Sequence, residues 1–251
     1  MSEKTNPIDG PHLLLAFFLI GALWQGASLL LNKPLLPAPY CVCQTWYTLM
    51  ASGVLWPHIA SSLYRMVCGL VLALLTAVPV GIIAGRSRRW DALLSPFLYI
   101  FYSIPKVLFL PVIIVVLGLG DFPKIFIIAI TVFFQIAIMV RDDAKAIPEE
   151  QVMTMRSLCG TPWQNFRHLI WPACLPGILT ALRTSLGIAL ALLFITETFA
   201  AFSGLGYFIM NRMESRNYEE MYAAILTLAA IGILAYMGLD IAERKLCPWK
   251  K

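Results

Sequence analysis

Charged residues are scarce in this chain, and they are not gathered in one place. Only 13% of its 251 residues are Asp, Glu, Lys or Arg, whereas an ordinary soluble domain has roughly 25%. The formal net charge is +5, and Lys and Arg are scattered between apolar runs instead of forming a basic stripe. Such a distribution cannot follow a phosphate backbone, so we expect no nucleic-acid partner.

Sequence motifs for catalysis and metal binding are also missing. The six cysteines include no C-x-x-C pair, so neither a zinc site nor a redox motif is predicted. No phosphate loop of the form G-x-x-x-x-G-K-S/T is present, so the chain has no signature of ATP binding. The three histidines join no Ser or Cys in a nucleophile motif. We therefore expect a non-catalytic chain without a metal or cofactor site.

Apolar residues dominate the composition instead. They make up 59% of the chain, and the mean hydropathy is +0.77, which is more apolar surface than a soluble globule hides. A membrane-spanning helix needs about 20 predominantly apolar residues. Six continuous runs approach or exceed this length, at residues 13–31, 59–85, 92–117, 125–140, 176–202 and 221–239.

These runs predict an all-α polytopic membrane protein with six transmembrane helices. Lipid offers backbone groups no water to bond, and the runs are continuous rather than alternating like barrel strands, so helices are the expected structure. Pro79, Pro105 and Pro111 lie inside runs. Neighbouring helices can bond the carbonyls that a proline frees, so these prolines predict bends rather than breaks.

The distribution of Lys and Arg in the short connections predicts the orientation. With a cytoplasmic N-terminus, most of these residues lie inside, and the outer connections carry only Lys33, Lys124, Arg212 and Arg216. Both termini are then cytoplasmic. Residues 1–56 form an N-terminal span and outer loop, and residues 57–249 form a core that contains the cytoplasmic loop 141–175.

Two short helices are predicted in loop 141–175. Pro148 suits the first helical position of one helix, and Gly160 suits the position just past its end. Thr161 and Gln164 begin the second as a capping box, and this helix should run to about residue 170, before Pro172 and Pro176 break it.

The first of these helices is amphipathic, because Val152, Met155, Leu158 and Cys159 share one face. Such a helix can lie on the membrane surface, or it can insert into a groove of a partner protein. The sequence leaves both alternatives open at this point.

Residues 156–187 resemble the signature loop of permease subunits of binding-protein-dependent ABC importers, in the nitrate, sulfonate and taurine branch. Their sequence is RSLCGTPWQNFRHLIWPACLPGILTALRTSLG. Residues 62–65 with 80–85 resemble the second span of that branch, and residues 104–120 resemble its third. Glu197 with residues 203–207 resembles the end of the fifth, and residues 243–249 resemble the closing segment. The resemblance is nearly continuous from about residue 57 to 249.

The resemblance implies a type I importer permease in the bacterial plasma membrane. Such a subunit lines the pathway of a small anionic or heterocyclic solute. Its implied partners are an extracytoplasmic binding protein, two ATP-binding subunits that hydrolyse the ATP, and a second permease subunit. For that subunit we favour a homodimer over a heterodimer. The alternative is a self-sufficient secondary transporter, which predicts broken helices at matching positions of two repeats, and the two halves show no such match.

The signature loop departs from the family pattern, which has a Glu-Ala-Ala core and a Gly six residues after the Glu. Counting back from Trp171 puts the Gly position at Cys159 and the Glu position at Met153. The implied docking patch for the ATP-binding subunit consists of Glu149, Glu150, Met153, Met155, Arg156 and Leu158, with Gly160 allowing the turn. Glu149 and Glu150 lie one turn before Met153 and can replace the usual acid.

Four charged residues lie in or near the spans, where a charge costs at least about 2.5–3.5 kcal/mol at a helix centre. Arg183 and Arg65 are expected to extend their side chains towards the headgroups. Glu197 lacks that length, so it should face the bundle interior. Two roles stay open for it, an ion pair with Lys106 or Arg65 and a contact with substrate. Glu197, Arg65 and Lys106 are therefore the pathway candidates.

Overall fold

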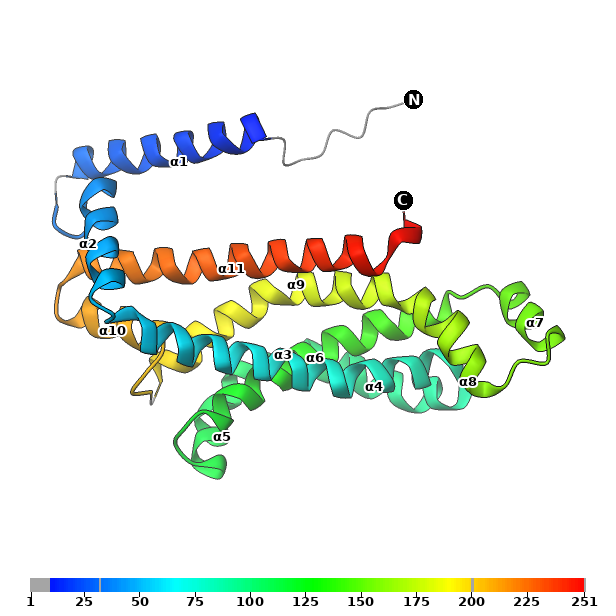
Figure 1. The fold of residues 1–251 in the computed structure, drawn as a ribbon. Helices are drawn as coiled ribbons and strands as arrows, with labels where there is room; N and C mark the ends of the chain where they lie inside the picture. Colours follow the sequence, from blue (N-terminus) through cyan, green and yellow to red (C-terminus); the bar gives the residue numbers. More distant parts are fainter. Residues whose placement is uncertain (1–9, 32, 200, 251) are drawn as a thin grey trace.

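The computed structural model describes residues 10–31, 33–199 and 201–250, and these residues form helices and their connections, with no strand among them. Figure 1 shows the helices, most of which lie roughly side by side. Their bounds are α1 Gly10–Leu31, α2 Pro39–Ala51, α3 Leu55–Arg86, α4 Arg88–Ser103, α5 Leu110–Leu117, α6 Phe122–Lys145, α7 Glu149–Ser157, α8 Pro162–Asn165, α9 Trp171–Thr198, α10 Leu205–Glu214 and α11 Tyr218–Leu246.

Among the described residues, four helical segments are long and apolar enough to cross a membrane, namely α3, α6, the continuous helix Pro162–Thr198 and α11. The bent pair α4 and α5 supplies a fifth if it is one span. The apolar stretch Phe18–Leu31 of α1 is shorter than a span. The all-α membrane fold is thus confirmed, whereas the sixth span stays a prediction.

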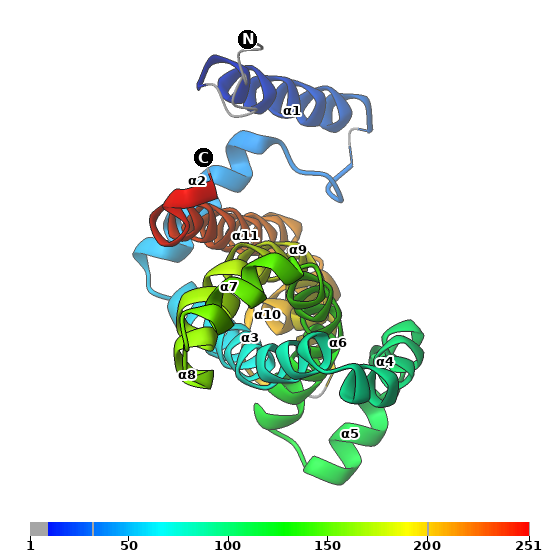
Figure 2. The same cartoon turned by 90° about the vertical axis from the view of Figure 1, so that its right-hand side faces the viewer.

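The molecule has two distinct ends (Figure 1). One end, which we call the α7 end, carries α7, α8 and the C-terminal part of α11. The opposite end, the α10 end, carries α2, α10 and the turn between α10 and α11. Seen from the α7 end, α3, α6, α9 and α11 form the bundle, while α4 and α5 lie on one side and α1 lies beyond α2 (Figure 2).

The centre of the bundle is the packing of α3 on α6. Small residues recur at every fourth position of α3, which places them on one face of that helix. They are Gly69, Ala73, Ala77, Gly81 and Gly85. Ala73 and Ala77 are fully buried, and a Cβ on Gly81 would approach the carbonyl oxygen of Ala137 to 2.7 Å. Membrane helices associate through such close approach, since lipid is as apolar as their side chains.

The third predicted span is broken and not merely bent. α4 and α5 meet at 77° around a 3₁₀ turn over Lys106–Phe109. Ile104 is extended at φ −83° and ψ 126°, as the residue before a proline prefers, and Pro105 has no N–H to continue the ladder. Pro111 opens α5, and Pro79 lies inside the uninterrupted α3, so neither breaks a helix.

The predicted break at Pro172 and Pro176 is wrong. One helix continues from Pro162 to Thr198 through a π-helical turn over Phe166–Ile170. In that turn the amide of Trp171 donates to the carbonyl of Phe166, five residues back. The wider turn accommodates Pro172, whose ring would otherwise press on the preceding turn of an α-helix. Pro176 then sits inside α9 without ending it.

Candidate functional site

A buried ion cluster joins three helices at the α10 end. Arg65 of α3, with 3% of its surface exposed, lies 2.7 Å from Glu197 of α9 and 2.7 Å from Asp121, which precedes α6. Its guanidinium also donates to the carbonyl oxygen of Ser203 at 2.7 Å and to the Ser203 hydroxyl at 2.8 Å. Arg65 therefore connects α3, α6, α9 and the segment that leads into α10.

The carboxylate of Glu197 is satisfied from several sides by the chain itself. Besides the Arg65 pair, it accepts from the Ser62 hydroxyl at 2.8 Å and from the Gly206 amide at 2.8 Å. The Ser62 oxygen in turn accepts from the Leu205 amide at 2.8 Å. A Cβ on Gly206 would approach the Cβ of Glu197 to 2.7 Å, so the start of α10 seats closely on Glu197. A fully bonded, fully buried carboxylate has the surroundings of a structural group.

These contacts show how the side chains of Arg65 and Glu197 are arranged. Arg65 does not extend towards the headgroups, because it is buried and paired with Glu197. The ion pair of Glu197 is made with Arg65, and the described contacts of Glu197 do not include Lys106. Ser62, Asp121 and Ser203 are not among the site residues predicted from the sequence. Ser62 could have been noticed, because it lies three residues before Arg65 and therefore on the same helix face.

Lys106 lies elsewhere, at the break of the third span. Its side chain is 8% exposed, and its Nζ donates to the Tyr102 carbonyl at 3.0 Å. The ammonium lies 4.8 Å from the ring centre of Phe134 and 5.7 Å from that of Tyr102. Within the part of the chain that the structure describes, no carboxylate forms an ion pair with it.

Arg183 does not extend freely towards headgroups either, because it is held by α11. Its guanidinium forms ion pairs with Glu243 and, at 3.3 Å, with Asp240. It also lies 5.4 Å from the centre of the Tyr236 ring. This arrangement ties α9 to α11 and gives Arg183 a packing role.

The connection from α7 to α8 confirms one predicted signal and corrects two others. The capping box of Thr161 and Gln164 is present, with both of its reciprocal hydrogen bonds. Pro148 lies one position before the helix and not at its first position. Gly160 does not occupy the left-handed position after α7. That position belongs to Cys159, whose φ is +53°.

The end of α7 is a Schellman motif built around Cys159. The Cys159 amide donates to the Arg156 carbonyl at 2.9 Å, and the Gly160 amide donates to the Met155 carbonyl at 3.2 Å. The motif normally puts glycine where Cys159 stands, since a left-handed backbone is unfavourable for residues with a Cβ. Cys159 also occupies the family Gly position counted from the sequence, so this chain places a left-handed residue at that position although the residue is not glycine.

Only some residues of the predicted docking patch are exposed. Glu149, Glu150, Met153, Arg156 and Leu158 are exposed, with Met153 at 60% and Leu158 at 72%, whereas Met155 and Gly160 are half-buried. Val152 packs into the core, whereas Leu158 and Cys159 are exposed, so the predicted apolar face, which also includes Met155, is not buried as a unit. Trp163 of α8 adds a large exposed ring, 65% accessible, to the same end of the molecule.

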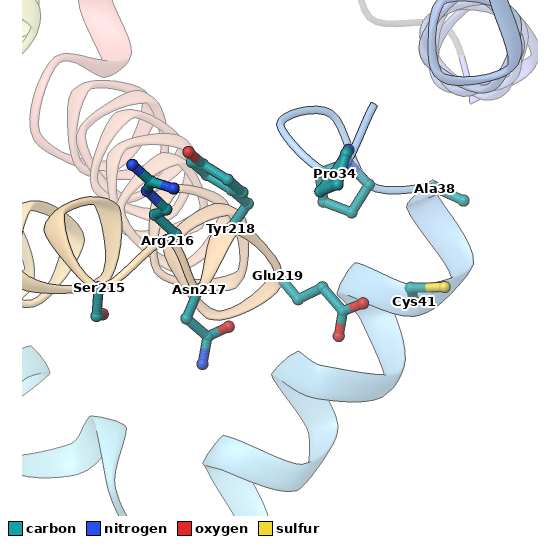
Figure 3. A pocket seen from close by; sticks show the side chains of 9 residues that line it. Pro34, Ala38, Cys41, Ser215, Arg216, Asn217, Tyr218 and Glu219 are labelled. Atoms are coloured by element: carbon teal, nitrogen blue, oxygen red, sulfur yellow. The ribbon is translucent and has the colours of Figure 1, made fainter. Parts of the chain in front are cut away.

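The α10 end also has a cavity, of about 460 Å³, between the start of α2 and the turn from α10 to α11. Figure 3 shows Arg216, Asn217 and Glu219 on one side of this cavity and Pro34, Ala38 and Cys41 on the other. Glu219 also accepts a 3.2 Å hydrogen bond from Thr45 of α2. The cavity therefore opens on the face opposite α7.

Known proteins match this arrangement of helices. The solved structure described as inward-facing conformations of the MetNI methionine ABC transporter superposes with a TM-score of 0.66 at 21% identity. The match covers 76% of this chain and 95% of that chain, and it confirms the type I permease fold.

The family model described as binding-protein-dependent transport system inner membrane component matches residues 77–248. This chain belongs to that family. The permease is 31% identical to the taurine transport system permease protein TauC of Escherichia coli (strain K12) over 92% of this chain and 86% of TauC. It is 32% identical to the putative aliphatic sulfonates transport permease protein SsuC of Bacillus subtilis (strain 168) over 95% of this chain and 87% of SsuC.

The family membership makes this chain a permease of an ABC importer, a multi-pass protein of the inner membrane. Proteins of this kind work with ATP-binding and substrate-binding partners. The relatives are named as transport permease proteins, which is consistent with a non-catalytic role for this chain.

The first prediction concerns the buried ion pair. Arg65→Gln leaves the Glu197 carboxylate buried without its cation, which costs about 3–5 kcal/mol, and Glu197→Gln strands the arginine at a similar cost. The double variant should lose much less than the sum of the two, since it strands neither charge. Melting temperatures of the purified permease in detergent measure all three. Arg244→Gln, at the exposed pair with Asp240, is the control and should change stability by about 0–1 kcal/mol. Additive losses in the double variant would contradict a structural pair.

The second prediction concerns the strained end of α7. Cys159→Gly removes the Cβ from a left-handed residue and should stabilise the turn by about 1–2 kcal/mol. Hydrogen exchange at the amides of residues 159 and 160 should then slow by about tenfold. Ser157→Gly, in the last helical turn, is the matched control and should speed exchange, because glycine is unfavourable inside a helix. Unchanged exchange in Cys159→Gly would contradict the strain.

Proposed function

We propose that this permease carries a small organic anion of the sulfonate class into the cell. The observation that carries the proposal is the similarity over most of the chain to permeases named for taurine and for aliphatic sulfonates. The buried cation Lys106, which has no ion pair among the described residues, supports an anionic solute. A heterocyclic solute is the competing class.

We propose further that two copies of this chain form the pathway and that two ATP-binding subunits dock at the α7 end. The exposed residues Met153, Arg156 and Leu158 would meet those subunits, with Glu149 and Glu150 supplying the acidic contact one turn earlier. The Schellman turn supports this role, because its two hydrogen bonds fix the course of the chain between the end of α7 and the long helix that begins at Pro162. A few exposed anchors suffice for docking, since interface energy is concentrated in few residues.

The binding protein would then dock at the α10 end, and both termini would be cytoplasmic. The excess of Lys and Arg in the connections near α7 supports this orientation. The residues of the ion cluster, Arg65 and Glu197, hold the helices together below the docking face in this arrangement. Under this proposal they are positioning residues of the pathway and do not contact the solute.

The third prediction tests the solute. The complete transporter is purified from its native membrane through a tag on this chain, and the ligand released from the co-purified binding protein is identified by mass spectrometry. We expect a small sulfonate, and the same compound should enter proteoliposomes only with ATP and the ATP-binding subunits. A heterocyclic ligand would refute the anionic class. Uptake by the permease alone would instead support a secondary transporter.

The fourth prediction tests the orientation with two native cysteines. Cys43 of α2 and Cys159 after α7 are both exposed, at opposite ends of the molecule. In spheroplasts, a membrane-impermeant maleimide should modify a variant that retains only Cys43. A variant that retains only Cys159 should react after permeabilisation and not before. Cys247 is buried, so a variant with that cysteine alone is a control with little labelling in either condition. The reverse pattern would overturn the orientation.

A further inference from the structure

A small cavity opens at the break of the third span, half-way along the bundle. Its volume is about 230 Å³, and the broken span lines it with Ser103 and Lys106. The other walls are Thr131 and Gln135 of α6 and Ile188 of α9. Thr131 and Gln135 are in the middle of α6, and Ile188 is in the middle part of α9, so the cavity lies about half-way along these two spans.

The Lys106 ammonium in this cavity uses only part of its hydrogen-bonding capacity on the described residues. An ammonium group carries three N–H donors, and in the described contacts Lys106 uses one, on the Tyr102 carbonyl. The rings of Phe134 and Tyr102 face the charge but cannot neutralise it. Arg65 and Arg183 are by contrast paired with carboxylates. A charge at the membrane centre is costly, so a residue of this kind marks a pathway or a missing counter-ion.

The cavity also faces away from the core of its own chain. Ile188 is 39% exposed, and Ser103 is exposed as well. Thr131 and Gln135 lie one turn apart on α6, so this face of an apolar helix is polar at mid-membrane. Polar side chains at this depth avoid lipid and face a water-filled space, and irregular backbone such as the Ile104 break is tolerated in the same place. These are the properties expected of a face that lines a pathway.

The neutral groups around Lys106 mainly offer acceptors. The hydroxyls of Ser103 and Thr131 donate to the backbone carbonyls of Tyr99 and Ile127, at 3.0 Å and 2.7 Å, which leaves their lone pairs free to accept. The amide nitrogen of Gln135 donates to Thr184 at 3.1 Å, which leaves the amide oxygen to accept. The cavity thus presents one cation and several acceptor oxygens beside apolar walls.

We propose that this cavity is a transient solute-binding site. Lys106 binds the anionic head of a small organic anion that carries a hydrogen-bond donor at its other end. The proposal rests on the proposed function and narrows its substrate class to an amino- or hydroxy-substituted short-chain sulfonate. The head replaces the missing counter-ion of Lys106. Ser103, Thr131 and Gln135 accept from the donor, which an unsubstituted alkyl chain cannot provide.

The test uses the complete transporter in nanodiscs without its binding protein, with taurine and 1-propanesulfonate as probes. Saturation-transfer NMR should detect taurine on the wild-type transporter, with a weaker signal for 1-propanesulfonate. Lys106→Met should weaken taurine binding at least about tenfold, because the charge-assisted hydrogen bond is lost, and Lys106→Arg should retain most of it. Lys245→Met, at an exposed position in the last turn of α11, is the matched control for the change in net charge and should bind like wild type.

Thermal melting and uptake measurements distinguish failure of the proposed Lys106 site from failure of the proposed function. Lys106→Met should melt no lower than wild type, because it removes a buried charge, while its ATP-driven sulfonate uptake falls. A lower melting temperature with unchanged taurine binding would make Lys106 a structural residue and would contradict the proposed solute-binding site. Normal uptake and binding by Lys106→Met would overturn it too, with the sulfonate function intact. A wild-type transporter that neither imports nor binds any sulfonate would overturn the proposed function itself.

Discussion

The close approach of α3 to α6 is the contact that positions both the ion cluster at Arg65 and the polar face of α6 at Gln135. In a bilayer, side-chain burial between helices gains little, so contact depends on backbones that can come near each other. The small residues at every fourth position of α3 allow this, and Gly85 comes so close to α6 that a Cβ would collide with the Arg141 carbonyl. α3 then presents Arg65 to Asp121 at one end of α6, and α6 presents Gln135 to α9 near its middle.

Two cations are buried to a similar extent but differ in whether carboxylates neutralise their charge. Arg65 is 3% exposed and bonded to two carboxylates and a serine, so its charge is neutralised by the fold. Lys106 is 8% exposed and has rings and a carbonyl for neighbours. Only the spatial surroundings separate these cases, because in the sequence both are single basic residues beside apolar runs.

Local signals predicted the elements well, and long-range contacts explain where the prediction failed. The capping box at Thr161 depends on residues three apart, and the apolar runs of α3, α6 and α11 depend on composition, so both are readable from the sequence. The partners of Arg65 are 56 and 132 residues away along the chain, which no local pattern reveals. Glycine favours a left-handed backbone, so the sequence predicts this position at Gly160, but α7 ends at Ser157 and the turn falls on Cys159. The effect of a proline is equally hard to predict from its position, because a break at Pro105 and a continuous helix at Pro172 depend on whether the preceding turn unwinds or widens.

The unbroken helix from Pro162 to Thr198 has a mechanical consequence. Its 37 residues follow a helix axis of about 55 Å, with the capping box of Thr161 at one end and Glu197 near the other. Under the proposed docking at the α7 end, a tilt of the first turns would therefore be carried to the carboxylate that seats α10 without crossing a non-helical joint. The π-helical turn at Phe166–Ile170 lies close to the end beside α7, where a change of hydrogen-bond pattern would alter the direction of the helix.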